Sequence, residues 1–407
     1  MIFSDLLEET YFSLASNKSR SALTILGIVI GIASVIAMIS IGQGASQSIT
    51  SKVESLGTNL LVVMPGRQKS SGSVVRNAMG SSQSLKMSDA EAIAASISNI
   101  KAVAPTVSSR KQVRTKTANT NTSIYGIDSQ YFSLKNVELE SGVALSETQI
   151  GSNAKVAVVG PTVRDTLFGE EVDCTGQKIK IDSQEYTIVG ITAAKGGTGM
   201  GSSDDLIYIP ISTMQKYITG NEYLSNINIQ VSSAGMMDLV QADVESLLLD
   251  LHKISDADSA DFSIMNQADM LSAMTSVTGT LTLLLGAIAG ISLLVGGIGI
   301  MNMMLTTVTE RTREIGLRKS LGANSHDISM QFLAESTALT FIGGIIGILL
   351  GCIAAWLITK LSGTTTAVTY TSVILSFGVS ALIGVVFGYY PARRASKLNP
   401  IDALRYQ

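Results

Sequence analysis

The hydrophobic positions of the chain are concentrated in long stretches that contain no charged side chain. The four longest stretches lie between pairs of charged residues: Arg20 and Lys52, Asp269 and Glu310, Glu335 and Lys360, and Lys360 and Arg393. An α-helix crosses about 30 Å of bilayer hydrocarbon with about 20 apolar residues. Each stretch contains such a run, so the pattern predicts four transmembrane helices, at 21–42, 277–309, 336–359 and 370–391.

The segment between the first two spans, residues 43–276, has a different pattern. Alternating or β-branched runs predict strands at 59–65, 155–160, 177–181, 185–191, 205–211 and 226–231. Residues 88–97 and 234–252 have the spacing of amphipathic helices, and Ser88 and Glu91 stand in capping-box register at the start of the first. The segment is therefore predicted to be a large mixed α/β domain.

The composition agrees with a membrane protein. The 407 residues are 46% hydrophobic and only 15% charged, whereas soluble domains carry about 25% charged residues. The first span follows two basic residues, as a signal peptide would, but its apolar run is longer than the roughly 7–15 residues of a signal peptide. We therefore expect it to remain as an anchor.

Lysine and arginine flank the spans unevenly. They precede the first span and follow the second and fourth, whereas the loop 360–369 offers Lys360 alone. By the positive-inside rule, segments 1–20, 310–335 and 392–407 are cytoplasmic, and 43–276 lies outside the cytoplasmic membrane. This outer segment contains 18 Lys and Arg against 24 Asp and Glu, a net charge of −6, which fits translocation.

Several kinds of chemistry are disfavoured by the residues that are missing. The predicted spans contain no Asp, Glu, His, Lys or Arg, and such residues mark ion pathways and proton relays. The glycine-rich stretch 195–203 lacks the Gly-Lys-Ser/Thr ending of a phosphate-binding loop, so it is predicted to be a flexible loop, like 66–84. The outer segment shows no nucleophile–base or metal-ligand cluster. We expect no catalytic, cofactor or metal site in this chain.

Glycines recur at four-residue spacing in all four spans. This spacing allows close helix packing or dimerisation, although membrane helices are generally rich in glycine. The candidate packing residues are Gly27, Gly31, Gly286, Gly290, Gly343, Gly347, Gly351, Gly384 and Gly388.

A dense mixed-charge segment, VTERTREIGLRKSLGANSHD at 308–327, begins where the second span ends. Glu314 and Arg318 can pair at i,i+4 in the favourable order, and Gly322 is a natural helix stop. Three residues are expected to form one apolar stripe: Ile315, Leu317 and Leu321. Such a helix, joined to a membrane span, is suited to bind a soluble partner and to be displaced by its movement. The alternative is that the segment is only a basic juxtamembrane anchor.

Three blocks resemble hallmark sequences of the MacB/FtsX-type ABC transporter permeases. They are GGIGIMNMMLTTVTERTREIGLRKSLGA at 296–323, NKSRSALTILGIVIGIASVIAMISIGQGA at 17–45 with LGTNLLVVMPG at 56–66, and YYPARRASKLNPIDALRYQ at 389–407. The resemblance covers the whole chain in order. The long outer segment favours the MacB branch over the cell-division FtsX branch.

The resemblance implies a homodimer in which each copy binds one cytosolic ABC ATPase subunit through the helix after the second span. The residues expected to couple to the ATPase are Glu310, Arg311, Arg313, Glu314, Ile315, Gly316, Leu317, Arg318, Lys319, Leu321 and Gly322. ATP and Mg would be bound by that partner, and this chain would not be an enzyme. The outer domain is implied to have a porter-like part with a mainly β insert at about 141–222, carried on stalks that continue the first two spans.

The function implied is ATP-driven export of amphipathic molecules, such as peptides or antibiotics, together with a membrane-fusion-type adaptor. Because the chain begins shortly before its first span, the ATPase is expected on a separate chain. Two alternatives stay open: a mechanical regulator of an outer partner, such as a cell-wall hydrolase or sensor, and a lipoprotein-releasing permease. Membrane lipid is the expected surrounding and no nucleic-acid partner is expected, while no motif identifies the substrate.

Overall fold

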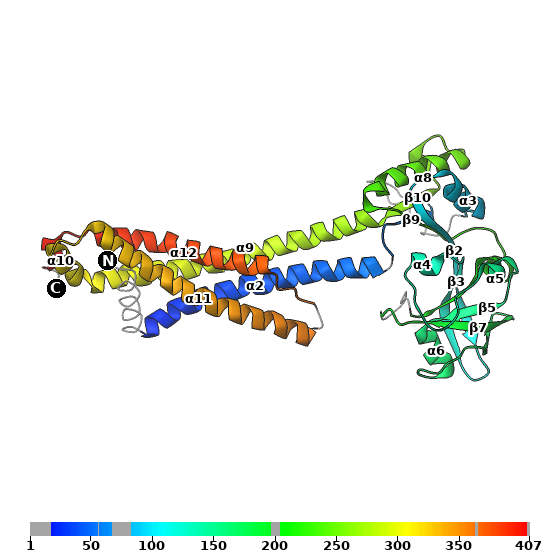
Figure 1. The fold of residues 1–407 in the computed structure, drawn as a ribbon, viewed down its shortest axis with the longest axis horizontal. Helices are drawn as coiled ribbons and strands as arrows, with labels where there is room; N and C mark the ends of the chain where they lie inside the picture. The colour runs from blue at the N-terminus through cyan, green and yellow to red at the C-terminus, as the bar shows by residue number, and fades with distance from the viewer. Residues whose placement is uncertain (1–17, 56, 67–82, 197–203, 363–364, 405–407) are drawn as a thin grey trace. The chain divides into compact units, whose positions relative to one another are not determined.

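The computed structural model describes residues 18–55, 57–66, 83–196, 204–362 and 365–404 (Figure 1). The chain divides into two compact units. The helical unit contains the described residues of 1–49 and 274–407, and the outer unit is Thr50–Ala273. The predicted loops 66–84 and 195–203 fall largely outside the described residues.

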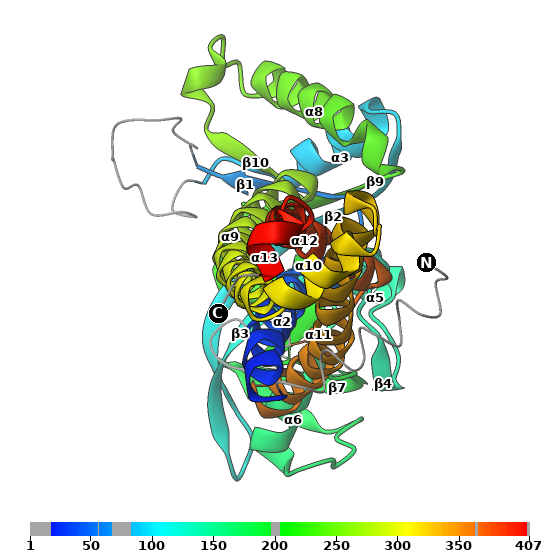
Figure 2. The same ribbon diagram turned by 90° about the vertical axis from the view of Figure 1, so that its left-hand side faces the viewer.

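The described part of the helical unit is built on four long helices that run side by side (Figure 2). They are α2 (Lys18–Ser55), α9 (Gln267–Glu310), α11 (Ser325–Ser362) and α12 (Tyr370–Ser396). Each contains an apolar window long enough to cross a membrane, so the predicted four-helix membrane fold is confirmed. The helices α2 and α9 extend well past the predicted spans, because polar residues end the hydrophobic run without ending the helix.

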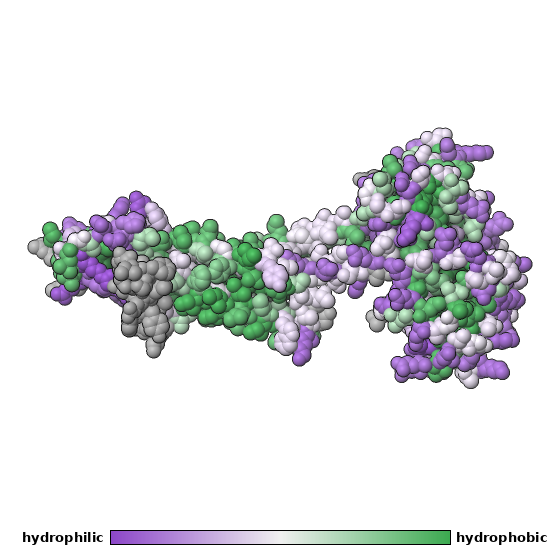
Figure 3. All heavy atoms as spheres, viewed as in Figure 1, coloured by the Kyte–Doolittle hydropathy of each residue, from purple (hydrophilic) through white to green (hydrophobic). Residues whose placement is uncertain are grey.

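The surface of the helical unit agrees with contact to lipid. Large apolar side chains are exposed on each long helix, and Figure 3 shows a hydrophobic belt along the middle of this unit. Trp356 is exposed and has the Lys360 ammonium 5.2 Å from its ring centroid, while Tyr389 and Tyr390 are exposed towards the other end of the bundle. Aromatic residues at both ends of an apolar belt are typical of membrane–water interfaces.

Hydroxyl groups connect the helices inside the bundle. The Ser380 hydroxyl donates to the Thr340 carbonyl at 2.8 Å, and the Ser336 hydroxyl to the Gly384 carbonyl at 3.2 Å. These bonds join α11 to α12 in a place where an unpaired polar group would be costly. The connection after α11 is held to α2 in the same way, since the Thr369 hydroxyl donates to Gln43 Oε1 at 2.9 Å.

The outer unit is organised around one mixed sheet. The strands are β1 (Leu60–Pro65), β2 (Ile100–Arg114), β3 (Asn119–Ile127), β4 (Leu139–Gly142), β5 (Val156–Val159), β6 (Lys178–Ile181), β7 (Gln184–Thr192), β8 (Leu206–Pro210), β9 (Asn226–Val231) and β10 (Phe262–Asn266). In the described residues their order is β10-β1-β9-β2-β3-β8-β5-β7-β4, and β6 pairs with β2 and β7. The predicted α/β class is confirmed, and all six predicted strands are present.

The strand β2 is shared by two lobes of this unit. Residues 100–106 pair with β9, and residues 107–114 pair with β3. The first lobe contains β10, β1, β9 and the helices α3 (Met87–Ser96) and α8 (Met237–Leu251), while the second contains β3–β8 with α4 (Tyr131–Leu134), α5 (Glu147–Gly151), α6 (Pro161–Phe168) and α7 (Ile211–Met214). The limits of the insert predicted at 141–222 stay a prediction, although strand pairing groups the end of β2 and all of β3 with that region.

The predicted capping box of α3 is wrong. The helix begins at Met87, so Ser88 already lies inside the first turn. Asp89 takes the capping role instead, because its Oδ2 accepts a hydrogen bond from the Lys86 backbone N–H at 2.8 Å. A carboxylate at this position also stabilises the positive end of the helix dipole.

Asp128, which follows β3, gives the outer unit a testable pH dependence. Burial of this carboxyl raises its pKa from 3.8 to about 6, although Oδ1 accepts a hydrogen bond from the Tyr131 N–H at 3.0 Å. An acid whose pKa is raised by folding stabilises the fold below pH 3.8, and this contribution is lost as the pH rises through about 6.

Asp128→Asn keeps the hydrogen-bond acceptor and removes the charge. We expect it to stabilise the protein by about 2 kcal/mol at pH 7, after allowing for screening by water, and to change little at pH 4. Thermal unfolding of the full chain at both pH values measures this. Equal effects at the two pH values would contradict it.

Candidate functional site

The mixed-charge segment forms a short helix joined directly to the end of α9. After Glu310 the chain bends at Arg311, and α10 runs over Thr312–Ser320. The hydrogen-bond ladder continues through the bend, because the Arg311 N–H donates to the Thr307 carbonyl and the Ile315 N–H to the Arg311 carbonyl, both at 2.9 Å. A displacement of α10 is therefore transmitted to α9 without a flexible linker.

One face of α10 is buried against the rest of the helical unit. Ile315 is buried in a cluster that includes Ile328 and Phe332 of α11. Gly316 lies against the helix α13 (Pro400–Leu404), where a Cβ added to the glycine would lie 2.7 Å from the Ala403 Cβ. Only glycine permits this close approach of the two helices.

Ion pairs and charged hydrogen bonds hold α10 to α11. Arg318 donates to Glu314 Oε1 at 2.8 Å and to Gln331 Oε1 at 2.7 Å, so the predicted i,i+4 pair is confirmed. Arg311, at the bend, lies 3.5 Å from the carboxylate of Glu335, which is only 2% exposed. Glu335 lies inside α11 and not in a loop, because α11 begins at Ser325.

Lys319 connects α10 to the end of α12. Its ammonium donates to the Ser396 carbonyl at 2.6 Å and to the Leu398 carbonyl at 2.9 Å. A cation at these free carbonyls satisfies the C-terminus of α12 and its dipole. The helix α10 is thus fixed to α9, α11, α12 and α13.

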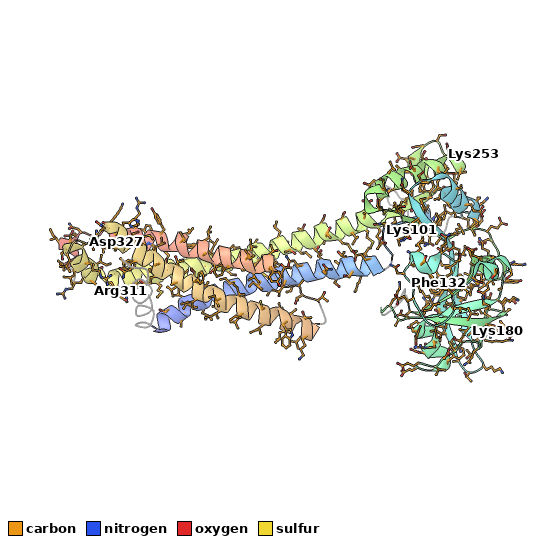
Figure 4. All side chains as sticks on the ribbon, viewed as in Figure 1. Lys101, Phe132, Lys180, Lys253, Arg311 and Asp327 are labelled. Atoms are coloured by element: carbon orange, nitrogen blue, oxygen red, sulfur yellow. The ribbon has the colours of Figure 1, made fainter. Side chains whose placement is uncertain are left out.

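The opposite face of α10 is exposed and mixed in character. Arg313 and Glu314 are exposed, as are Leu317 at 53% and Leu321 at 82%. The predicted single stripe is therefore wrong: at 100° per residue, Ile315 and Leu317 lie on nearly opposite sides of the helix. Figures 1 and 4 show that α10 and the labelled Arg311 and Asp327 lie at one end of the helical unit.

The helix stops where the sequence predicts. Gly322 has a φ of 98°, which glycine adopts without strain, and the Ala323 N–H donates to the Arg318 carbonyl at 3.0 Å. Ile401, which sequence reasoning did not single out, adds a side chain that is 63% exposed on the neighbouring α13. Its place beside α10 depends on the contact at Gly316, which hydrophobic patterning does not reveal.

Most of the candidate packing glycines lie at helix contacts. A Cβ on Gly31 would be 2.8 Å from Leu293, and the backbone at Gly27 faces Gly296 of α9. The other glycines that meet a neighbouring helix are Gly343, Gly347 and Gly351, against α2, and Gly384 and Gly388, against α11. A Cβ on Gly286 or Gly290 would meet no atom within 4 Å in the described structure.

Among the residues that the structure describes, no group of three or more His, Cys, Asp or Glu side chains could hold a metal ion.

Two family models match the chain: the MacB-like periplasmic core domain at residues 21–247, and the FtsX-like permease C-terminal domain at residues 286–400.

Two similar proteins are described as macrolide export ATP-binding/permease protein MacB. The one from Bdellovibrio bacteriovorus is 42% identical over 402 residues, covering 98% of this chain and 61% of its own length. The one from Wolinella succinogenes is 39% identical over 401 residues, covering 98% of this chain and 60% of its own length. The chain therefore spans about three fifths of these relatives. The crystal structure of the periplasmic region of MacB from Actinobacillus actinomycetemcomitans matches 56% of this chain and 97% of its own, at 23% identity and a TM-score of 0.47.

Proposed function

The chain belongs to the family of MacB-like, FtsX-type ABC transporter permeases, and we propose that it transmits the conformational changes of an ABC ATPase across the membrane. The observation that carries this proposal is the arrangement of α10. Its buried face is fixed to four other helices, and its exposed face presents Arg313, Glu314, Leu317 and Leu321 to a partner. A surface of exposed leucines among charged residues suits a protein interface, in which an apolar centre is surrounded by polar contacts.

In this proposal the end of the unit that carries α10 is cytoplasmic, together with both chain termini, and the outer unit is extracytoplasmic. ATP and Mg are bound by the ATPase, and this chain contributes movement and no catalytic group. The ATPase module is attached through α10 whether it belongs to another chain or to another part of a longer one.

The proposed cargo is amphipathic, such as a peptide or an antibiotic, which an extracytoplasmic adaptor helps to expel. The names of the similar proteins support export as the direction of transport. Several hydroxyl groups inside the bundle already donate hydrogen bonds to backbone carbonyls, as at Ser380 and Thr340. Such a bundle is better suited to transmitting force than to conducting ions.

A homodimer is part of the proposal. The outward faces of Gly286 and Gly290 meet no atom within 4 Å, and a groove between α2 and α9 is lined by small residues that include Gly42, Thr282 and Gly286. A helix of a second copy could approach closely there.

The function is tested by purifying the tagged chain from its own host in mild detergent and identifying the proteins that accompany it. An ABC ATPase with an adaptor supports export. An ATPase with a cell-wall hydrolase or a sensor kinase would support the regulatory alternative, and impaired lipoprotein sorting after gene deletion would support the lipoprotein-releasing one. No ATPase, in a preparation that keeps other complexes intact, contradicts the proposal.

The exposed leucines of α10 give a sharper test. Leu321→Ser should lower the recovery of the ATPase with the chain about tenfold, because a leucine at an interface contributes roughly 1–2 kcal/mol to binding. The folded chain should be unaffected, since Leu321 is 82% exposed. Quantitative copurification measures the loss, and transport assays show whether export falls with it.

Leu361→Ser is the matched control, because Leu361 is 79% exposed at the other end of α11. It removes a similar apolar side chain and should leave ATPase recovery unchanged. Equal recovery with wild type, Leu361→Ser and the double variant Leu317→Ser, Leu321→Ser would exclude this face of α10 as the coupling surface.

A further inference from the structure

The second lobe of the outer unit carries a group of basic side chains on one exposed sheet face. Arg110 and Arg114 lie four residues apart on β2, and Lys178 and Lys180 lie two residues apart on β6. Residues at i and i+2 of a strand share a face, and all four side chains are exposed. We call this surface the basic sheet face; Figure 4 labels Lys180 on it.

The register of the sheet brings like charges together on this face. Arg114 of β2 is paired directly with Lys180 of β6. Directly opposed residues in an antiparallel pair have Cβ atoms about 4.5–5.5 Å apart, and like charges at this distance destabilise the sheet. The sequence thus retains one unfavourable cross-strand pair, while Glu185 opposes Lys180 on its other side. Exceptions to local rules are expected at functional sites.

The charges on this face are only partly compensated. The carboxylate of Glu185 lies on the same face, where it is paired with Lys180 in register and bonds to the Lys178 ammonium at 3.3 Å. Arg110 donates to the Asn121 carbonyl at 3.0 Å, and Arg114 to the Asp182 carbonyl at 3.4 Å. In the described part of the chain, Arg110, Arg114 and Lys180 form no ion pair. The carbonyl contacts position the two guanidinium groups while leaving their charge available.

The basic sheet face contrasts with the rest of its domain. Residues 43–276 have a net charge of −6, so the cations are concentrated against an acidic background. Besides Glu185, the side chains that share this face with the cations include amides and hydroxyls: Gln112, Asn119, Asn121 and Ser123. These groups can add hydrogen bonds to carboxylates or to a polypeptide backbone. A flat, polar and positively charged surface suits an extended anionic partner.

We propose that the basic sheet face binds an acidic segment of an extracytoplasmic protein. A protein is favoured over a lipid surface because membrane-binding surfaces insert apolar or aromatic side chains, whereas the described residues of this face are polar. Arginine recognises carboxylates through paired N–H donors, which adds orientation to attraction. The inference rests on the proposed function in that it places this face outside the cytoplasm and gives the export system a protein partner there.

The test uses the full chain in detergent and a short fluorescein-labelled poly-glutamate as the probe. Fluorescence anisotropy should show binding that weakens as ionic strength rises. Arg114→Gln, Lys180→Gln should reduce the affinity about tenfold, as expected for the loss of two charged contacts. The control Lys101→Gln, Lys253→Gln removes the same charge from exposed lysines of the first lobe, both labelled in Figure 4, and should reduce it far less.

The comparison between the two double variants decides the outcome. Equal affinity losses in Arg114→Gln, Lys180→Gln and in Lys101→Gln, Lys253→Gln would overturn the inference.

Two further measurements distinguish a protein partner from a lipid surface, and this inference from the proposed function. Binding of phosphatidylglycerol vesicles that is lost in Arg114→Gln, Lys180→Gln, without any binding of poly-glutamate, would overturn the inference in favour of lipid. ATPase recovery through α10 should be unchanged in this variant. Failure of the proposed function would appear in that recovery, whereas failure of the present inference would appear only in probe binding.

Discussion

Replacing Gly347 by valine should prevent the helical unit from folding correctly. Gly347 of α11 faces α2, where a Cβ would lie 2.9 Å from the Ile32 Cβ and 3.1 Å from the Val29 carbonyl oxygen. These are atoms of a helix backbone or close to it, so rotation of a side chain cannot relieve the clash. Overpacking costs about 1–3 kcal/mol and occasionally more. Because the clash involves atoms that cannot rotate away, we expect a cost at the upper end and loss of most of the monodisperse protein in detergent.

Gly290→Val is the matched control for this prediction. A Cβ at Gly290 would meet no atom within 4 Å, although this glycine lies in the same kind of apolar helix. The variant should fold, and under the proposed dimer it should weaken association between copies. Size-exclusion chromatography and thermal unfolding distinguish the two effects. Normal folding of Gly347→Val would show that α2 and α11 do not pack as described.

Replacing Arg311 by methionine should destabilise the joint between α9 and α10. Arg311 is a charged partner of Glu335, whose side chain is buried in α11. Removing one member of a buried ion pair is more harmful than removing both, because the remaining charge stays in a poorly solvated place. We expect a loss of about 2–3 kcal/mol in stability and a loss of export that exceeds the loss of ATPase binding.

A double-mutant cycle tests the cause of this effect. Arg311→Met, Glu335→Gln removes both charges and should recover much of the stability lost in Arg311→Met alone. Thermal unfolding of the four proteins gives the interaction energy. Additive losses would show that the two side chains act independently and that the pair does not fix the joint.

The sequence predicts the membrane part well because uncharged runs of this length are rare in soluble domains. It does not predict where the helices end, since Gln43 and Lys52 are polar but continue α2 without a break. The hairpin of β2 and β3 is missed for a related reason. Its outer half, around Arg110–Ser123, is rich in Ser, Thr and Asn, and is exposed enough to have the composition of a loop.

The candidate site is predicted in outline and not in detail. The i,i+4 pair of Glu314 and Arg318 depends only on helix geometry, and it is present in the structure. The separation of Ile315 from Leu317 follows from helix geometry as well, because residues two positions apart lie about 200° apart around the axis. Knowledge of the neighbouring helices is required only to say that the face of Ile315 is the buried one. The contact between Gly316 and Ala403 joins residues far apart in sequence, and a single sequence gives no signal for it.

The sharing of β2 between two lobes has a consequence for how the outer unit unfolds. Residues 100–106 belong to the ladder of one lobe and 107–114 to that of the other, within a single strand of 15 residues. Neither lobe can separate from its half of β2 without exposing the amides of that half and loosening the strand to which the other lobe is paired. Native-state hydrogen exchange should therefore find amides in β9 and β3 opening together, as one cooperative unit. A ligand held by either lobe would then slow exchange in both.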